Sequence, residues 1–393
     1  MNASTRIGLS PPRPAGRHGP AAFRAAVLVL AGALLAMSTG IAHGQFPTRE
    51  FPKTDFDNRI VDFAEIMSGG PPKDGIPAVD DPRYVTVEEA GGWLDPDEPV
   101  IAIEIGGEAR AYPLQILIWH EIANDVLGGT PIAVTFCPLC NSAIAFDRRI
   151  DGDTLDFGTT GRLRLSDLVM YDRQTETWWQ QLTGTGIIGA HAGAVLVRLP
   201  AGIVAWNEFR TAFPEGSVLS RETGHSRAYG SNPYAGYDSS TQPFLFRETP
   251  DPRLPAMERV LHVAAGGAER IYPFGAFADE PVINDEVGGA PVVVMSREGT
   301  LSALDQSRIA NSRRIPSAAA FSRRAANRVL EFEVRDGRVA DTATGSLWNL
   351  FGEAVEGPLA GTRLEPLSRG EHFAFAWLAF HPDADVYGVP APR

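Results

Sequence analysis

The residues best suited to chemistry in this sequence are two cysteines, Cys137 and Cys140, which stand three positions apart in Cys-Pro-Leu-Cys. They are the only cysteines among 393 residues, so they are available for one shared task. A pair at this spacing can hold a metal ion, cycle between dithiol and disulfide, or form a short-loop disulfide bridge. The surrounding residues favour a functional thiol or metal site over an inert bridge.

A metal site needs a tight turn after a strand and at least one ligand besides the two sulfurs. Asn141 follows the second cysteine, and asparagine tolerates the left-handed backbone that such a turn requires. His120 is the best candidate for the further ligand, because its segment leads directly into the strand that carries Cys137. The sequence thus predicts a copper or zinc site formed by Cys137, Cys140 and His120, and the same three residues are the candidate catalytic residues. Taken singly, His120 fits a hydrogen-bonded core histidine equally well.

The two alternatives for the cysteine pair stay open. A thioredoxin-like redox site places a helix after the motif, whereas the residues after Cys140 alternate as in a strand. A disulfide across so short a loop stabilises little, but short-loop bridges are often redox-active. The expected partner is therefore a metal, a small molecule or a thiol-redox protein.

Several function classes are excluded. The segment His120-Glu-Ile-Ala-Asn124 lacks the second histidine of a zincin helix. Asn141 directly follows Cys140, where covalent haem attachment requires a histidine. The formal net charge of -13 argues against nucleic acid as a partner.

The first 44 residues are typical of a secretory signal peptide. Four arginines precede the apolar run AAVLVLAGALLAM, and small residues before Gln45 provide a cleavage site. The run is short and no second one follows it, so we expect no stable membrane span after signal removal. The sequence therefore predicts a periplasmic or secreted protein.

An internal repeat organises the rest of the chain. The segment from Gly106 aligns without a gap on the segment from Gly266, with shared Tyr-Pro, Asn-Asp and Gly-Gly pairs. Glu280, Arg297 and Thr300 stand opposite His120, Cys137 and Cys140, so only the first copy carries the site. The predicted divisions are a signal peptide (1–44), an N-terminal extension (45–97), repeat 1 with the site (98–250) and repeat 2 without it (251–393).

The predicted fold class is mainly β (α+β), with two tandem structural repeats of short antiparallel strands and few helices. Alternating apolar residues and glycine turns predict the strands, and Asp151-Gly152 predicts a hairpin. Helices are expected over residues 114–129 and around Trp206.

Aromatic residues give a rival prediction from another functional class. The segment 220–237 is rich in glycine, serine and tyrosine, and it could cover the cysteines or brace the repeats. With Trp178 and Trp179 it could instead form an aromatic groove. The protein would then be a cell-envelope binding or scaffold module with an inert disulfide.

Four elements of the sequence together carry a resemblance to a known family, and they are residues 111–148, 168–189, 220–237 and 253–263. With these elements the sequence resembles a family catalogued as a domain of unknown function, DUF3179. The resemblance runs from about Ile76 to the C-terminal region. At Asn141 the family more usually has glycine. The resemblance implies an exported protein and a shared His and Cys-x-x-Cys pattern, but no reaction.

Overall fold

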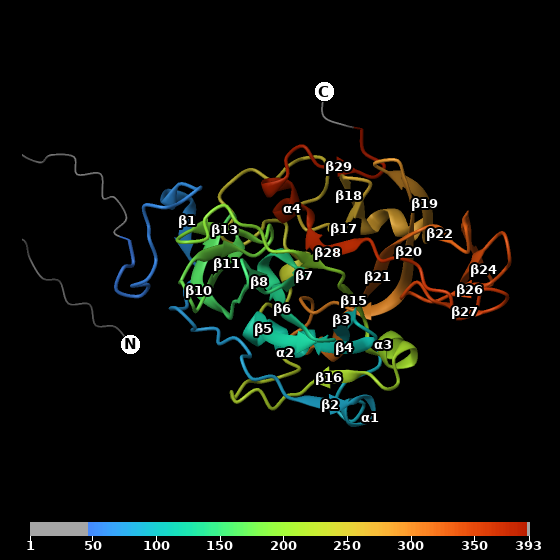
Figure 1. Cartoon of the computed structure of the whole chain (residues 1–393), viewed down its shortest axis with the longest axis horizontal. Coiled ribbons are helices and arrows are strands. Elements are labelled where there is room, and N and C mark those ends of the chain that lie inside the picture. Colours follow the sequence, from blue (N-terminus) through green and yellow to red (C-terminus); the bar gives the residue numbers. More distant parts are fainter. Residues whose placement is uncertain (1–45, 391–393) are drawn as a thin grey trace, which may run out of the picture. The chain divides into compact units, whose positions relative to one another are not determined.

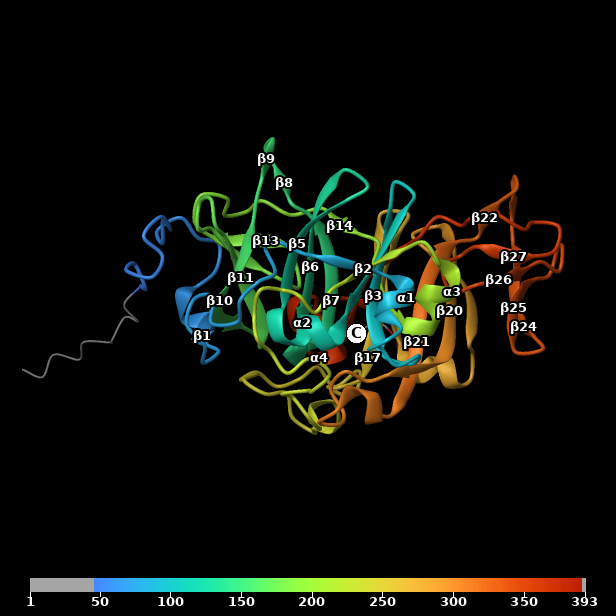
Figure 2. The ribbon, with the colours of Figure 1, turned by 90° about the horizontal axis from the view of Figure 1, so that it is seen from below.

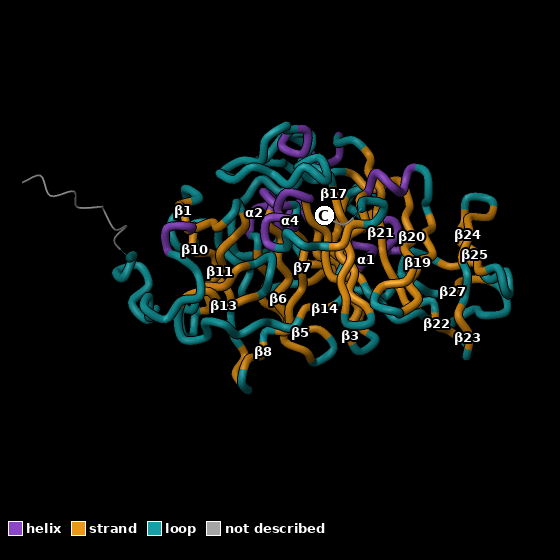
Figure 3. Tube along the Cα trace, turned by 90° about the horizontal axis from the view of Figure 1, so that it is seen from above, coloured by secondary structure: helices purple, strands orange, loops and turns teal. Residues whose placement is uncertain are grey.

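The fold is mainly β, as the sequence predicts. The computed structural model describes residues 46–390, so the predicted signal peptide lies outside the described residues. Strands dominate the trace, and helices are few and short (Figure 3). No helix within residues 46–390 is long and apolar enough to cross a membrane. The α-helices are α1 (Val87–Ala90), α2 (Leu114–His120), α3 (Trp206–Ala212) and α4 (Ala374–Phe380).

The largest sheet joins strands from both predicted repeats. Strand β28 pairs with β7, with Glu371 opposite Ala143, so a strand near the C-terminus lies beside the strand that follows the cysteines (Figure 1). Both predicted repeat ranges therefore contribute to one sheet. Its order is β29 (Asp385–Val386), β18 (Ala268–Pro273), β17 (Arg259–Ala265), β28 (Ser368–Phe373), β7 (Ser142–Asp147), β6 (Thr130–Cys137) and β5 (Ile122–Leu127), with β14 (Arg198–Leu199) also pairing with β7.

Two five-stranded sheets belong to the N-terminal half. In Figure 2, β10 and β11 lie on one side of β5, β6 and β7, while β2 and β3 lie on the other. One sheet has the order β1 (Ile66–Ser68), β10 (Phe157–Arg164), β11 (Asp167–Asp172), β12 (Trp178–Gln180) and β13 (Thr185–Ile188). The other has the order β15 (Gly202–Ala205), β3 (Pro99–Ile105), β4 (Glu108–Pro113), β16 (Ser217–Leu219) and β2 (Tyr84–Thr86).

The remaining strands form smaller sheets and hairpins. The predicted Asp151-Gly152 turn connects β8 and β9, which confirms that hairpin. The three-stranded sheet contains β19 (Val282–Val287), β20 (Ala290–Leu301) and β21 (Arg314–Ser322), and the four-stranded one contains β24 (Phe332–Arg335), β25 (Arg338–Asp341), β26 (Leu347–Trp348) and β27 (Ala354–Glu356). The hairpins are β8 (Arg149–Ile150) with β9 (Asp153–Thr154) and β22 (Arg324–Ala325) with β23 (Arg328–Val329).

Aligned residues of the two halves make the same contacts. The side chains of Arg110 and Tyr112 both donate to Asp125, and those of Arg270 and Tyr272 both donate to Asp285. The amide side chains of Asn124 and Asn284 likewise bond the backbone of Phe157 and Phe332. These are contacts that the alignment leads us to expect, while the tandem repeat itself remains a prediction.

The Gly-Gly pairs that the two halves share are explained by close packing of the backbone. The turn after β3 packs against the turn after β5, and a Cβ on Gly128 would lie 2.3 Å from the carbonyl oxygen of Ile105. In the second half, a Cβ on Gly266 would lie 2.2 Å from the carbonyl oxygen of Gly288. Both positions also have positive φ, so only glycine fits without strain.

The helix expected over residues 114–129 is much shorter than predicted. Helix α2 ends at His120, Glu121 adopts a left-handed conformation with φ 58°, and the next residues form β5. Strand β5 pairs with β6 from Ile122 to Leu127. The apolar residues in this stretch fit both periodicities, and strand pairing decides between them.

Candidate functional site

The cysteines lie in a tight turn between two paired strands. Strand β6 ends at Cys137, residues 138–140 form a single 3-10 turn, and β7 begins at Ser142, which pairs with Cys137. Asn141 has φ 45°, which confirms the predicted left-handed position. Both cysteines are buried free thiols. No α-helix follows them, so the helix-dipole activation of a thioredoxin-like site is absent at this turn.

Asp167 is the third member of this site. The two sulfurs and one carboxylate oxygen of Asp167 lie within 4.8 Å of one another. Its Oδ2 accepts hydrogen bonds from Gln180 Nε2 (2.6 Å) and from the Leu182 amide (2.9 Å). Its Oδ1 is buried and has no nitrogen or oxygen donor among residues 46–390, and the two cysteine thiols are the donors nearest to the carboxylate. The carboxylate is therefore held firmly on one side and keeps an oxygen available on the other.

The long hairpin formed by β10 and β11 places Asp167 next to the cysteines. Strands β10 and β11 pair Phe157 with Asp172, and the matching hairpin of the second half pairs Phe332 with Asp341. The first hairpin is the longer one, and Asp167 lies next to its tip. Asp167 is not among the site residues predicted from the sequence. The extra length of this hairpin relative to the second half was the available signal.

The tip of that hairpin is strained. Leu165 and Ser166 both adopt left-handed backbone conformations, with φ values of 52° and 68°. Non-glycine residues in this region are uncommon, and they persist where the surrounding structure holds them. Ser166 is fully buried and donates a hydrogen bond to the carbonyl oxygen of Phe244 at 2.6 Å. Together with Asn141 and Glu121, four such residues border the cysteine site.

The electrostatics of the site disfavour negative charge. Burial raises the pKa of the Cys137 thiol and raises that of Cys140 further. Burial also raises the pKa of Asp167 to about 6 and that of the neighbouring Glu121 to about 8. Each of these four acids lies near another, and each disfavours ionisation of its neighbours. Asp167 forms no salt bridge within residues 46–390, and the mostly buried guanidinium of Arg198 attracts its carboxylate only at longer range.

His120 lies outside the group formed by the two cysteines and Asp167. Its Nδ1 is 2.7 Å from the carbonyl oxygen of Pro77, and its Nε2 is 2.7 Å from the hydroxyl of Tyr229. Burial lowers its pKa to about 4, so the ring is neutral at pH 7. Both ring nitrogens are thus engaged, which matches the core-histidine alternative.

The tyrosine-rich segment lies directly against the site. The Tyr237 hydroxyl donates to the carbonyl oxygen of Leu139, inside the Cys-x-x-Cys turn, at 2.9 Å. Tyr234 is mostly buried, and burial, with the nearby Glu121 and Cys137, raises its pKa. The same segment contacts the second half, where the side-chain amide of Asn232 donates to the carbonyl oxygen of Gln306 at 3.1 Å. It therefore both covers the cysteines and braces the two halves.

The predicted aromatic groove is wrong for its two tryptophans. Trp178 and Trp179 are both fully buried. Trp178 packs against Phe51, with ring centroids 5.0 Å apart, and Trp179 donates to Asp172 Oδ2 at 3.0 Å. They belong to the core because their rings fill it and the indole of Trp179 finds a buried acceptor there.

The second half has no equivalent of this site. Strand β20 runs continuously from Ala290 to Leu301, past the positions that align with the cysteines, with only a bulge before Thr300. Arg297 pairs with Glu208, and the Thr300 hydroxyl bonds that of Ser317. The turn that presents the thiols is thus a feature of the first half.

These features define a class: a mainly β protein with a buried dithiol and carboxylate cluster under an aromatic segment. The family model described as "Protein of unknown function (DUF3179)" matches residues 73–384, and the chain belongs to that family. No curated protein matches the chain. No solved structure matches it either.

Proposed function

We propose that Cys137, Cys140 and Asp167 together hold a divalent metal ion, with zinc as the first candidate. The observation that carries this proposal is the burial of three acidic groups around one point, with no salt bridge to the Asp167 carboxylate among residues 46–390. A bound cation would favour the ionised forms of these three groups, which burial alone disfavours, because a coordinated thiol is deprotonated by the metal. Ligands on a zinc ion lie about 3.5 to 3.8 Å apart, which needs only a small contraction of the cluster.

The ligand types favour zinc over copper. Two thiolates alone suit Cu(I), whereas a carboxylate oxygen is a harder ligand that Cu(I) does not seek. Three protein ligands also leave a fourth zinc position for water or substrate, as in catalytic zinc sites. His120 then acts as a positioning residue, since its hydrogen bond to Tyr229 holds the segment that covers the cysteines.

The second candidate function is thiol–disulfide exchange by Cys137 and Cys140. It is favoured by two free thiols that lie close together at Cys-x-x-Cys spacing. Oxidation would join the two sulfurs, release two protons and pass two electrons to a disulfide of a redox partner, which would become two thiols. Burial and raised pKa values disfavour attack by either thiolate, so the metal is the stronger proposal.

We further propose that the protein acts outside the cytoplasm, in the periplasm or after secretion. This rests on the predicted signal peptide at residues 1–44. Such a compartment would oxidise an exposed dithiol, and a bound metal would protect it.

The test is metal content by elemental mass spectrometry, with thiols counted on the same sample. The mature protein is purified from the native host without chelator. We expect near-stoichiometric zinc in the wild type and at least tenfold weaker zinc affinity in Cys137→Ser and Asp167→Asn. The matched control is Glu371→Gln, which alters a buried acid that is not a ligand and should keep the metal.

Three results would redirect the proposal. Loss of metal in His120→Gln, with a wild-type circular dichroism spectrum, would place the histidine among the ligands. A metal-free protein whose two thiols are oxidised and reduced reversibly would favour redox work. A metal-free protein in which both cysteines can be replaced by serine without loss of activity in the host would favour the scaffold alternative.

A further inference from the structure

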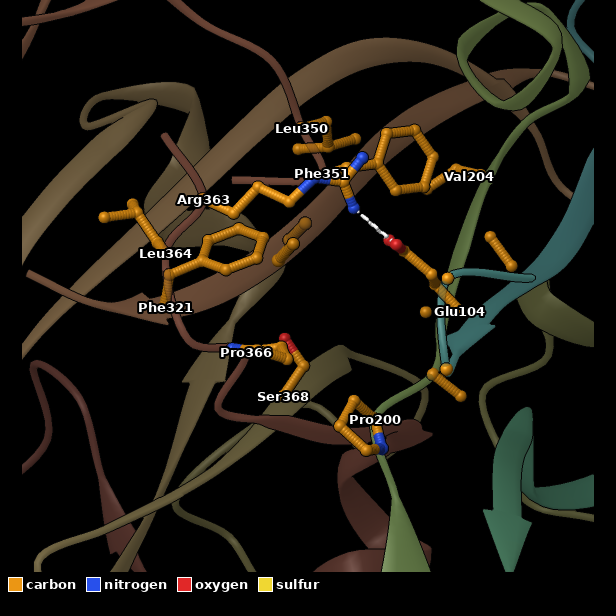
Figure 4. Close-up of a pocket in the computed structure, with 17 residues that line it drawn as sticks. Glu104, Pro200, Val204, Phe321, Leu350, Phe351, Arg363, Leu364, Pro366 and Ser368 are labelled. Atoms are coloured by element: carbon orange, nitrogen blue, oxygen red, sulfur yellow. Dashed lines mark hydrogen bonds and ion pairs between the residues drawn. The ribbon is translucent and has the colours of Figure 1, made fainter. Parts of the chain in front are cut away.

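A second candidate site lies where the two halves meet, away from the cysteines. A solvent-open cavity of about 310 Å³ lies between β3 and β15 of the first half and β21 and residues 350–368 of the second. Figure 4 shows Phe321, Leu350 and Val204 around it, with an ion pair between Glu104 and Arg363 at its edge. Its walls are mostly apolar, and several of them are alanine or glycine.

The two halves also meet at a second junction, where β28 lies between β17 and β7 and β14 pairs with β7. The equivalent positions of this junction show which side chains could fill the cavity. Val204 pairs with Val100, and His372 pairs with Val260, which is the residue aligned with Val100. Val204 and His372 thus occupy equivalent places. In the same way, Pro366 lies opposite Phe321 at the first junction, and Arg198 lies opposite Phe146 at the second. Pro366 and Arg198 are therefore equivalent as well.

A third pair of equivalent positions, Ala102 and His262, differs in the same way. Ala102 lies opposite Ala111 in the β3–β4 hairpin, and His262 lies opposite Ile271 in the matching β17–β18 hairpin. At the second junction these positions carry large side chains: His262 and His372 are buried, and Arg198 Nη1 lies 3.0 Å from His262 Nδ1. At the first junction, alanine, valine and proline take the places of two histidines and an arginine, and they leave a cavity.

The polar groups of the cavity are already satisfied. Arg363 pairs with Glu104 and also with Glu353, at 3.0 Å from the latter. Ser368 Oγ accepts a hydrogen bond from the Ala320 amide at 2.7 Å. None of the residues around the cavity has a buried polar side-chain atom without a partner, within the described chain. The cavity therefore offers apolar contact and no free charge.

We propose that this cavity binds a small uncharged apolar molecule, the size of two fused rings or a short acyl chain. Its volume and apolar walls are those of small-molecule sites. The second junction shows that this backbone accommodates larger side chains at the equivalent places. An occupant of similar size would remove the apolar walls from water, which is favourable. An uncharged occupant fits because the ion pair at the edge is complete. This inference is independent of the metal proposal.

The experiment measures binding of N-phenyl-1-naphthylamine, an uncharged dye that fluoresces in apolar sites, to the full mature protein. We expect saturable binding of one dye per chain, and at least tenfold weaker binding of 8-anilinonaphthalene-1-sulfonate, which carries a charge. Ala319→Phe fills the cavity from a half-buried wall position and should reduce dye affinity at least tenfold. Val197→Phe adds the same ring at an exposed position outside the cavity and should leave affinity unchanged.

Val204→His provides a second variant that fills the cavity, because it introduces the residue found at the equivalent position of the second junction, His372. Loss of dye binding in either filling variant, with a wild-type circular dichroism spectrum, supports the proposal. The proposal is overturned if the wild type shows no saturable binding, if a folded filling variant binds as the wild type does, or if the charged dye binds equally well. Neither variant touches the cysteines, so metal content should stay at the wild-type level.

Discussion

Tyr237 and Leu139 are joined by a hydrogen bond from the tyrosine hydroxyl to a carbonyl oxygen inside the Cys-x-x-Cys turn, at 2.9 Å. The same hydroxyl accepts a bond from the Phe244 amide at 3.2 Å. The tyrosine-rich segment is therefore fastened to the turn that carries both thiols. We therefore expect access to the thiols to depend on opening this segment.

The first prediction concerns that access. Tyr237→Phe removes both bonds at the hydroxyl, which should make local opening easier by about 1 to 2 kcal/mol. In the metal-free protein we expect the two thiols to react with 5,5′-dithiobis(2-nitrobenzoate) roughly tenfold faster than in the wild type. Tyr387→Phe is the control, because Tyr387 bonds Glu280 in the second half. An unchanged thiol reaction rate in Tyr237→Phe would show that the segment does not limit access.

The second prediction tests the backbone at Asn141, whose φ is 45°. Asn141→Ala and Asn141→Gly both remove the side-chain bond to Glu371, so they differ mainly in their tolerance of this conformation. We expect Asn141→Ala to lower the free energy of unfolding by about 1 kcal/mol more than Asn141→Gly does, as measured by urea denaturation. Zinc affinity should follow the same order. Equal stability of the two variants would mean that the turn relaxes without the left-handed residue.

Part of this site could be predicted from the sequence, and part could not. The turn and Asn141 were predictable because strand alternation and local backbone preference act over a few residues. Asp167 was not, because its place depends on the length of a hairpin that starts beyond the cysteines. His120 was close in sequence, but the end of α2 at Glu121 and the bonds to Pro77 and Tyr229 keep its ring in a separate network.

The mainly β class was predictable for a similar reason. Short alternating runs and glycine turns fix strands and hairpins locally. The pairing of β28 with β7 joins residues more than two hundred positions apart, and no local pattern indicates it. The length of α2 was overestimated because residues 122–127 carry both periodicities, and only pairing with β6 makes them a strand.

The third prediction compares matched carboxylates in the two halves. Asp125 is almost fully buried and is bonded by Arg110, whereas Asp285 is bonded by Arg270 and is more exposed. Asp125→Asn weakens a buried ion pair and should lower the free energy of unfolding by about 3 kcal/mol. Asp285→Asn should cost about 1 kcal/mol, because solvent screens this pair. Urea denaturation measures both, and equal costs would contradict the difference in burial.

The last prediction is a pH dependence that arises from Glu371. Burial raises the pKa of this carboxyl from its ordinary value of 4.5 to about 7, against the opposing effect of Arg259. Between these two values the folded protein binds more protons than the unfolded chain, so this group lowers stability as the pH rises. Above pH 7 the loss is complete, and it amounts to at most about 3 kcal/mol.

Glu371→Gln removes that titration. Measured relative to the wild type, its free energy of unfolding should therefore rise by up to about 3 kcal/mol between pH 5 and pH 8. Glu298→Gln, at an exposed position, is the control and should show no such change. The measurement is urea denaturation of the metal-free protein at both pH values. The other buried groups titrate alike in the variant and in the wild type, so their effects cancel in the difference. A difference between Glu371→Gln and wild type that does not change with pH would show that Glu371 is not protonated in the folded protein at pH 5 to 7.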